Sequence, residues 1–372
     1  MPWVECGFPP EPAAAWGDAA VIVPWVIYER TADLQILRDQ FSSMSAWVDL
    51  LEEYSGGTGL WNTGFQLGDW LDPAAPAENP GESHTDAYLV ATAYFARSAE
   101  LVSKAAFAIG DMGAFERYRA IHAKVRTAFQ AEFVSATGRV VSDTTTALSL
   151  AIVFDLLEPA QRERAGRRLA ELVVQGDHRI QTGFVGTPII CDALVAVGAV
   201  DTAYHLLLQE QFPSWLYPVT MGATTIWERW DSMLPNGEIN PGEMTSFNHY
   251  ALGAVVDFLH RVVAGLAPLE PGYKKILVKP IPGGGMTRAS ARHITPLGAA
   301  EVSWVRDGDS ITVDVTVPMG ATADIQLPGD LVPRATVAGG AHRFTSNFAA
   351  AEHDAVAPVL ENPHKPAALE FV

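Results

Sequence analysis

Glu228 is the residue whose surroundings most suggest chemistry, because it lies between two tryptophans in the segment TTIWERWD, residues 224–231. Aromatic rings such as Trp227 and Trp230 offer flat faces on which a sugar ring can lie. They also shield a carboxylate from water, which favours its protonated form. The alternative is a surface Glu228–Arg229 pair on a helix whose tryptophans point into the core. The octapeptide alone supports both interpretations equally.

Other carboxylates with aromatic neighbours occur earlier in the chain. Asp18 follows Trp16-Gly17, and Asp69 and Asp72 flank Trp70 in an acidic, glycine-containing stretch at residues 61–73. Asp18 also suits the N-cap of a helix, and Trp70 suits simple packing. Hydrolysis of a glycosidic bond needs two carboxyl groups, one protonated and one ionised. The candidates are Asp18, Asp69, Asp72, Glu228 and Asp231, together with His249.

Several other chemistries lack their sequence patterns. The chain shows no glycine-rich phosphate loop after a strand, no Gly-x-Ser-x-Gly motif and no His/Cys cluster with metal-ligand spacing. We therefore expect no cofactor and no metal site. The ten histidines are scattered. Those at 122, 205 and 260 fall within expected helices, where a structural role is the simplest interpretation.

Composition limits the classes of partner that the chain can bind and indicates the compartment in which we expect it. The chain has 372 residues and a formal net charge of -18, which argues against binding to nucleic acids or anionic membranes. Its two cysteines form no disulfide framework, which suits a reducing, cytoplasmic compartment. We recognise no signal peptide and no apolar run long enough to cross a bilayer. A neutral ligand such as a sugar remains compatible with this charge.

The order of helices and ring-rich loops predicts a mainly α protein. Apolar residues recur every three or four positions at 34–51, and further helices are expected through the segment 247–266. Loops that carry aromatic residues recur once per helix pair, which is typical of an α/α toroid with its long loops at one end. We expect about nine helices before Gly265, whereas a closed ring of six hairpins needs twelve.

Residues 268–272, with two prolines and a glycine, are expected to form a linker, and after it the period changes from helical to alternating. The segments 276–278, 299–305, 311–317 and 323–327 predict strands separated by Gly, Pro and Asp turns. We therefore expect a helical domain at residues 1–267, a small antiparallel β-sandwich at 268–345 and a weakly ordered tail at 346–372.

Six motifs occur in an order that resembles a known enzyme family. They are AWGDAA at 15–20, GFQLGDWL at 64–71, TGFVGT at 182–187, the segment 222–231, SFNHY at 246–250 and PGY at 271–273. Together they resemble the bacterial α-L-rhamnosidases of glycoside hydrolase family 78, over residues 2 to about 327. The resemblance implies an (α/α)6 barrel, a C-terminal antiparallel β-domain, and inverting hydrolysis of terminal α-L-rhamnosyl bonds without a metal at the reacting centre.

The resemblance also assigns roles to residues. Glu228 resembles the general base, and Asp18, Trp70 and His249 match positions that contact rhamnose in the family. The residues Trp227, Trp230 and Asp69 are expected close by. We expect His249 in the first turn of the last helix, where the helix dipole would assist donation to a sugar hydroxyl or to Glu228.

The family's general acid is a glutamate in a segment of the form Asp-x-x-x-x-Glu-Arg upstream of the Trp16 motif, and that segment is absent from this sequence. We therefore expect a toroid incomplete at its N-terminus that holds half of a catalytic pair. Its expected partner is a rhamnose-containing small molecule or oligosaccharide. The alternatives are a carbohydrate-binding remnant without activity and an α/α-barrel glycosidase or lyase that acts on another sugar.

Overall fold

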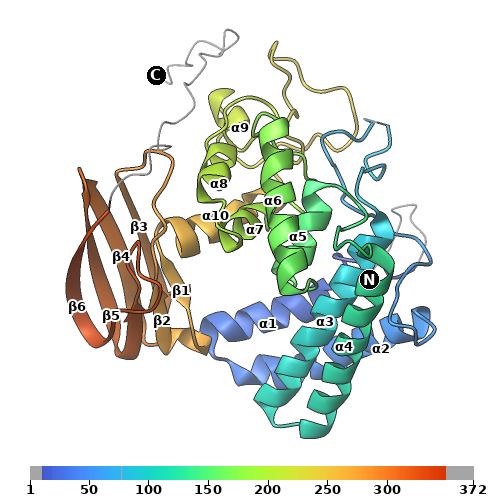
Figure 1. Ribbon diagram of the computed structural model, residues 1–372, viewed down its shortest axis with the longest axis horizontal. Helices are drawn as coiled ribbons and strands as arrows, with labels where there is room; N and C mark the ends of the chain where they lie inside the picture. Colours follow the sequence, from blue (N-terminus) through green and yellow to red (C-terminus); the bar gives the residue numbers. More distant parts are fainter. Residues whose placement is uncertain (1–10, 77, 349–372) are drawn as a thin grey trace. The chain divides into compact units, whose positions relative to one another are not determined.

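The computed structural model describes residues 11–76 and 78–348 and divides into two compact units. The first contains residues 11–22 and 41–254, and the second contains residues 23–40 and 255–348. The first unit is helical, whereas the second combines short helical segments with a β-sheet (Figure 1). None of the described helices combines the length and the apolar character needed to cross a membrane.

Local signals in the sequence set the helix ends. The Asp86 carboxylate accepts hydrogen bonds from the second and third backbone N–H groups of α3. That helix stops at Gly110, whose φ of 87° lies in the left-handed region that favours glycine. Pro159 opens α6, where its missing N–H costs no hydrogen bond. The helices are α1 (Ala19–Thr31), α2 (Leu34–Tyr54), α3 (Ala87–Ile109), α4 (Met112–Phe133), α5 (Thr145–Val153), α6 (Pro159–Gln175), α7 (Ile190–Ala196), α8 (Val200–Leu207) and α9 (Leu216–Thr220).

Successive helices pack as hairpins, with α3 against α4, α5 against α6 and α7 against α8. The predicted ring-rich loops are present as long irregular segments at 55–86, 176–189 and 221–250. Apart from residue 77, these segments are described throughout and hold most of the candidate residues. The helix hairpins therefore form the scaffold on which the irregular segments meet.

The single helix expected at 247–266 is wrong in its extent. The structure has a 3-10 helix at Ala251–Ala254, α10 at Val255–Phe258 and a π-helix at Leu259–Val263. Residues 247–249 are not helical because their backbone groups bond to an adjacent segment, with His249 N donating to Ile226 O at 2.8 Å. His249 thus precedes the helical turns, and the expected assistance from a helix dipole is withdrawn.

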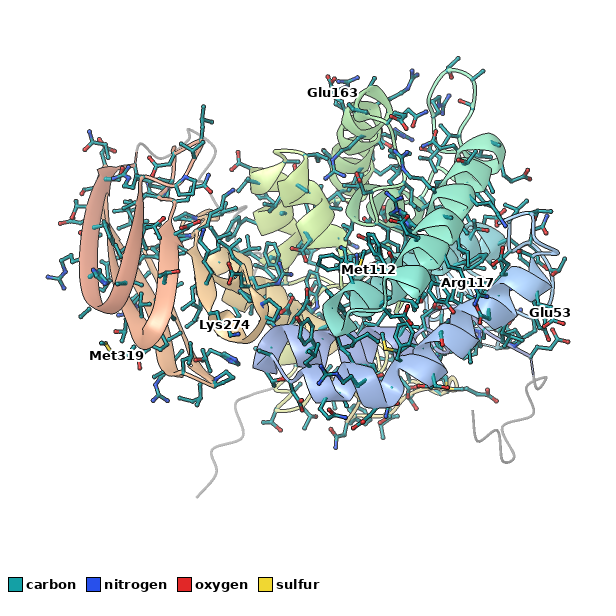
Figure 2. All side chains as sticks on the ribbon, turned by 90° about the horizontal axis from the view of Figure 1, so that it is seen from below. Glu53, Met112, Arg117, Glu163, Lys274 and Met319 are labelled. Atoms are coloured by element: carbon teal, nitrogen blue, oxygen red, sulfur yellow. The ribbon has the colours of Figure 1, made fainter. Side chains whose placement is uncertain are left out.

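The sheet of the second unit has six strands in the order β1-β2-β5-β4-β3, with β6 paired to β5. All pairs are antiparallel except β2 with β5, which run parallel. The two strands expected at 311–317 and 323–327 are one strand, β5, with a register shift between Val317 and Thr322. Met319, at this irregularity, is 77% exposed at the end of the sheet (Figure 2). The strands are β1 (Leu266–Pro268), β2 (Lys275–Val278), β3 (Arg288–Thr295), β4 (Gly298–Asp307), β5 (Ser310–Ile325) and β6 (Ala335–Asn347).

The second unit has its own apolar core. Trp304 is 1% exposed at its centre, and its indole N–H donates to Val263 O at 2.8 Å. Tyr273 is also buried, and its hydroxyl accepts from Arg30 at 2.5 Å. The boundaries expected at 267/268 and 345/346 stay predictions, and the expected tail lies outside the described residues from 349 onwards.

Candidate active site

Two irregular segments place Glu228 beside His249. Residues 225–228 and 246–249 are joined by three interactions: Thr225 Oγ1 donates to Phe247 O at 2.5 Å, His249 N to Ile226 O at 2.8 Å, and Glu228 N to Ser246 O at 2.9 Å. The Glu228 side chain is fixed by the same pairing, because Ser246 N donates to its Oε2 at 3.2 Å. Both main chain and side chain of the glutamate are therefore held.

The second carboxylate oxygen of Glu228 faces an imidazole. His249 Nε2 lies 3.9 Å from Glu228 Oε1, too far for a hydrogen bond but close enough for one ligand atom to contact both. The other ring nitrogen of His249, Nδ1, accepts from Ala251 N at 3.2 Å. In the neutral imidazole the proton is then on Nε2, which is the nitrogen that faces Glu228. The pair combines a fixed acceptor with an N–H donor.

Glu228 lines a small cavity of about 30 Å³. A space of this size holds one or two water molecules. Asp72, Phe184, Trp230 and Asp231 share its wall. A carboxylate next to a water-sized space has the geometry that a general base requires, since the base must reach the proton that it removes.

The two aspartates in this wall are already engaged as acceptors. Asp231 accepts from Arg229 Nε at 3.2 Å and from Asn240 Nδ2 at 2.9 Å. Asp72 accepts from two backbone N–H groups, at 2.9 and 3.1 Å. Both residues therefore suit the support of loops better than proton donation.

Asp69 lies elsewhere in the same unit and organises the loop 182–187. It is fully buried and accepts from Thr146 Oγ1 at 2.5 Å and from three backbone N–H groups, those of Gly183, Val185 and Gly186, at 2.8 to 3.2 Å. Burial raises its pKa to about 6, although the bond from Thr146 opposes the shift. A Cβ on Gly183 would lie 2.3 Å from Asp69 O, so only glycine allows the two backbone segments to come this close.

The loop that Asp69 holds brings Phe184 to the cavity. Phe184 N donates to Trp70 O at 2.8 Å, and its ring lies 5.2 Å from that of His249, centroid to centroid. Asp69 thus connects to the Glu228–His249 pair through Phe184. The sequence placed the TGFVGT loop but did not single out Phe184 or Ser246. Only the motif order hinted at them, because their roles depend on contacts between distant segments.

Asp18 is also fully buried and does not cap α1 with its side chain. It accepts from Ala15 N at 2.8 Å, from Trp47 Nε1 at 2.8 Å and from Ser98 Oγ at 2.5 Å. Burial raises its pKa, and the bonds from Ser98 and Trp47 oppose the shift. The charges of Asp18 and Asp69 both add to burial in raising the pKa of Tyr94, so this tyrosine lies in the electric field of both carboxylates.

The tryptophans of the candidate set differ in exposure. Trp227 is 4% exposed and packs edge-on against Phe247, and Trp230 is 5% exposed and packs edge-on against Trp215. Their rings shape the segment around Glu228 and leave little open face for a sugar. Trp70 is only half-buried. Sugar contacts by Trp70, Trp227 and Trp230, like that by Asp18, stay predictions.

A family model for the bacterial alpha-L-rhamnosidase six-hairpin glycosidase domain matches residues 2–263, and a model for the bacterial alpha-L-rhamnosidase C-terminal domain matches residues 265–342. The chain belongs to the α-L-rhamnosidase family. The six helix hairpins of that description are the (α/α)6 toroid, so the predicted fold class is confirmed. The resemblance inferred from the six motifs is confirmed as well.

Curated relatives agree with this assignment. An α-L-rhamnosidase of Streptomyces avermitilis is 37% identical over 89% of this chain, and one of Formosa agariphila is 38% identical over 86% of it. The aligned regions cover 33% and 34% of those proteins. The chain therefore spans about one third of the length of the curated relatives that it matches.

Solved structures show the same fold. The native α-L-rhamnosidase from Aspergillus terreus has a TM-score of 0.87 and 40% identity, over 90% of this chain and 39% of that one. The Streptomyces avermitilis enzyme complexed with L-rhamnose has a TM-score of 0.82 and 36% identity, over 90% of this chain and 33% of that one. The helical and sheet units together are thus the part of the family fold that this sequence covers.

Proposed function

We propose that this chain takes part in the hydrolysis of terminal α-L-rhamnosyl bonds, with Glu228 as the general base. The observation that carries the proposal is the fixed glutamate beside His249 at a water-sized cavity. A base in this position removes a proton from the water that attacks the anomeric carbon. The family membership supplies the reaction class, and the solved relative complexed with L-rhamnose supports the sugar.

A displacement by water at the anomeric carbon inverts its configuration, because the water enters opposite the leaving oxygen. Such a mechanism needs room for a water between the base and the sugar. The cavity of about 30 Å³ at Glu228 provides that room. We therefore propose an inverting enzyme, in which the first product of an α-L-rhamnoside is β-L-rhamnose.

The acid of the pair has no counterpart around Glu228. Among the described residues that line its cavity, the other carboxylates are Asp72 and Asp231, and both already accept hydrogen bonds from neighbouring groups. The upstream acidic motif of the family is not in this sequence. We propose that these 372 residues hold the base and lack the acid.

Rhamnose contacts complete the proposal. We propose that His249 Nε2–H donates to a sugar hydroxyl next to the attacked carbon, which its position beside Glu228 and its bond from Ala251 N support. Trp70 is half-buried and offers ring surface, while Asp69 positions Trp70 and Phe184 through the loop 182–187. Asp18 lies beneath the surface, where it supports the same interior as Asp69.

The test is the substitution Glu228→Gln in a form of the protein that hydrolyses an aryl α-L-rhamnoside. Glutamine keeps the size of the side chain and its bond from Ser246 N, but it cannot remove a proton. We expect kcat to fall by about 10²–10⁴-fold, the range for loss of a general base. Glu243→Gln, on an exposed carboxylate of the neighbouring segment, is the matched control.

Two further readouts sharpen the test. NMR of the first-formed sugar identifies its anomer, and α-L-rhamnose as the initial product would refute inversion. In Glu228→Ala, added azide can replace water as the nucleophile, because azide needs no base to remove a proton. We therefore expect azide to restore turnover and to give a rhamnosyl azide as the product. Wild-type kcat in Glu228→Gln would exclude this residue as the base.

Among the described residues that line the Glu228 cavity, no second carboxyl group is free of hydrogen bonds from its neighbours, which also favours a second candidate function, carbohydrate binding without turnover. Calorimetry with L-rhamnose on this chain, next to an aryl rhamnoside assay, separates the two. Heat of binding without product formation supports a binding role. Product formation that depends on Glu228 supports the hydrolase.

A further inference from the structure

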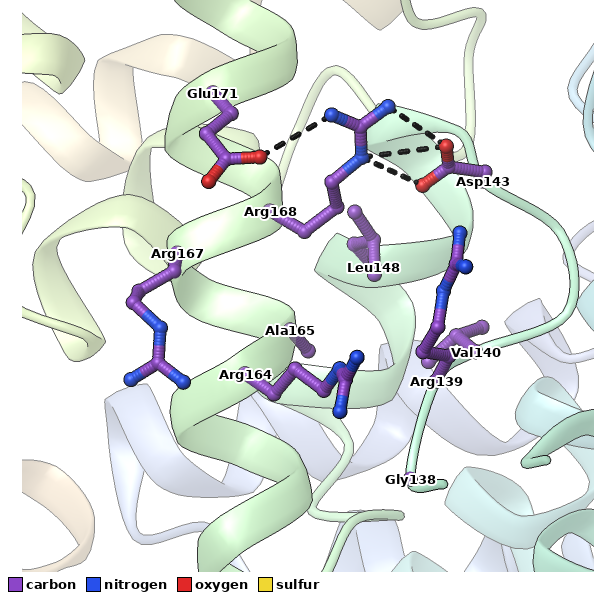
Figure 3. A pocket seen from close by; sticks show the side chains of 10 residues that line it. All are labelled: Gly138, Arg139, Val140, Asp143, Leu148, Arg164, Ala165, Arg167, Arg168 and Glu171. Atoms are coloured by element: carbon purple, nitrogen blue, oxygen red, sulfur yellow. Dashed lines mark hydrogen bonds and ion pairs between the residues drawn. The ribbon is translucent and has the colours of Figure 1, made fainter. Parts of the chain in front are cut away.

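A pocket of about 650 Å³ lies between α5, α6 and the segment 138–143 of the first unit (Figure 3). Four arginines contribute to its wall, two on consecutive positions of α6. Arginine guanidinium groups recognise carboxylate, sulfate and phosphate oxygens through paired N–H donors. The wall comprises Gly138, Arg139, Val140, Asp143, Leu148, Arg164, Ala165, Arg167, Arg168 and Glu171.

Two of these arginines already have carboxylate partners. Arg168 donates to both oxygens of Asp143, with the shortest distance at 2.7 Å, and to Glu171 at 3.2 Å. Arg167 forms an ion pair with Glu163, one turn earlier on α6. These pairs are intramolecular and neutralise the charges of Arg167 and Arg168. They hold the wall in place and leave recognition to the remaining arginines.

Arg139 and Arg164 are the other two. Both are exposed, and in the part of the chain that the structure describes neither is hydrogen-bonded to a carboxylate. The charge of Arg139 does act on Asp143, whose pKa is lowered chiefly by the hydrogen bond from Arg168 and further by Arg139. Arg164 donates one N–H to Thr137 O at 2.9 Å, and its other N–H groups stay available. In Figure 3 its guanidinium extends from α6 toward the segment that carries Arg139. The pocket wall carries four arginines and two carboxylates, Asp143 and Glu171, whereas the whole chain has a net charge of -18.

The pocket adjoins the cavity of Glu228 through an intermediate pocket. Asp143 lines both the arginine pocket and a second one of about 400 Å³. This second pocket shares Asp72, Pro73 and Phe212 with the wall of the Glu228 cavity. Each depression thus shares wall residues with the next, and Asp143 is the residue common to the arginine pocket and the intermediate pocket. A ligand long enough to follow them would reach from Glu228 to Arg139.

We propose that the arginine pocket binds an anionic group on the leaving part of the substrate, so that the preferred glycosides are acidic saccharides bearing carboxylate or sulfate ester groups. The inference rests on the proposed function for the identity of the reacting end. Arg139 and Arg164 supply the charged donors, and the pocket between them and Glu228 takes the intervening sugars. The contact is distant from the reacting atoms and therefore acts on binding.

The test is calorimetry on the full chain with a galacturonate tetramer and with its methyl ester, which has the same sugar backbone without the charges. We expect the acid to bind about tenfold more tightly than the ester, as charge-assisted hydrogen bonds at an exposed site imply. In Arg139→Ser/Arg164→Ser this preference should disappear. Arg117→Ser/Arg119→Ser removes two exposed arginines of α4 that do not line the pocket, and the preference for the acid should remain.

Inorganic sulfate and phosphate at equal ionic strength identify the source of the anion. Binding of sulfate or phosphate as tight as that of the tetramer would show a small-anion site and overturn the proposal. Equal affinity for acid and ester, or an unchanged preference in the Arg139/Arg164 variant, would overturn it too. Hydrolysis of a neutral aryl rhamnoside should be unaffected by the double substitution. If neither the unchanged protein nor any variant hydrolyses the aryl rhamnoside, the proposed function fails. The calorimetric comparison of acid and ester still tests whether the arginine pocket binds anions.

Discussion

His249 presents one defined nitrogen to Glu228, and this follows from a backbone contact. Because Ala251 N occupies Nδ1, the neutral ring carries its proton on Nε2. The ring is held in that orientation by stacking on Tyr250, with centroids 5.5 Å apart, and by Phe184 at 5.2 Å. A histidine fixed in this way suits the proposed donation to a sugar hydroxyl, and proton abstraction is proposed for the carboxylate of Glu228.

We expect His249→Ala to raise KM for an aryl rhamnoside about tenfold, with a smaller effect on kcat, because one hydrogen bond to the sugar is lost. His249→Gln keeps a side-chain N–H and should recover part of the loss. Steady-state kinetics measures both constants. His205→Gln, whose ring bonds to a backbone carbonyl of its own helix, is the control. A fall in kcat as large as that in Glu228→Gln would instead place His249 in the proton transfer.

At the scale of elements, the site is built from loops that buried carboxylates hold together. Asp69 gathers three backbone N–H groups of the loop 182–187 that would otherwise need water. The same loop delivers Phe184 to His249. The aromatic residues in these loops, recognised in the sequence, thus correctly indicated where the candidate site residues lie. Which loop touches which was decided by Asp69 and by the pairing of residues 225–228 with 246–249.

Asp69 should make stability depend on pH. Burial raises its pKa from 3.8 to about 6, so the folded state binds this proton more tightly than the unfolded state. Its contribution is therefore fully present below about pH 4 and is lost as the pH rises to about 6, by about 3 kcal/mol. Asp18, whose pKa is also raised by burial, acts with the same sign.

We expect Asp69→Asn to flatten the fall in unfolding free energy between about pH 4 and pH 6, since the amide does not titrate. Urea unfolding at a series of pH values measures the slope. Asp39→Asn, at an exposed carboxylate of α2, should leave the slope unchanged. An unaltered slope in Asp69→Asn would show that this carboxyl group is ionised throughout the range.

At the scale of the whole molecule, the chain consists of a helical unit that contains the candidate site and a second unit with its own core. Strands with alternating apolar residues, such as β4 and the first half of β5, were predicted from sequence. β3 and β6 were missed because no strong apolar alternation marks them, and most of their residues are only partly buried or exposed. β3 is a strand because it pairs with β4, and β6 because it pairs with β5, and neither pairing is visible in the local sequence.

Substitution of Trp304 tests whether the assigned apolar core stabilises the second unit. Trp304→Ala removes a ring that is 1% exposed and leaves Val263 O without its indole donor. We expect a loss of about 3–5 kcal/mol in unfolding free energy, measured by urea denaturation followed by circular dichroism. Val305→Ala, the next residue on the opposite face and 55% exposed, should change stability by less than about 0.5 kcal/mol. Equal effects of the two substitutions would contradict the assigned core.

The sequence by itself determined the family, the helical order and the candidate Glu228, because motif order, apolar period and residue type are local properties of the chain. The tertiary structure decided which candidates meet. Hydrogen bonds between residues far apart in the chain place Glu228 beside His249. Asp18 and Asp69 are buried and support the surrounding loops. The predicted last helix is instead a series of three short helical segments. Those outcomes depend on which backbone groups find partners across the fold, and local periodicity carries no record of that pairing.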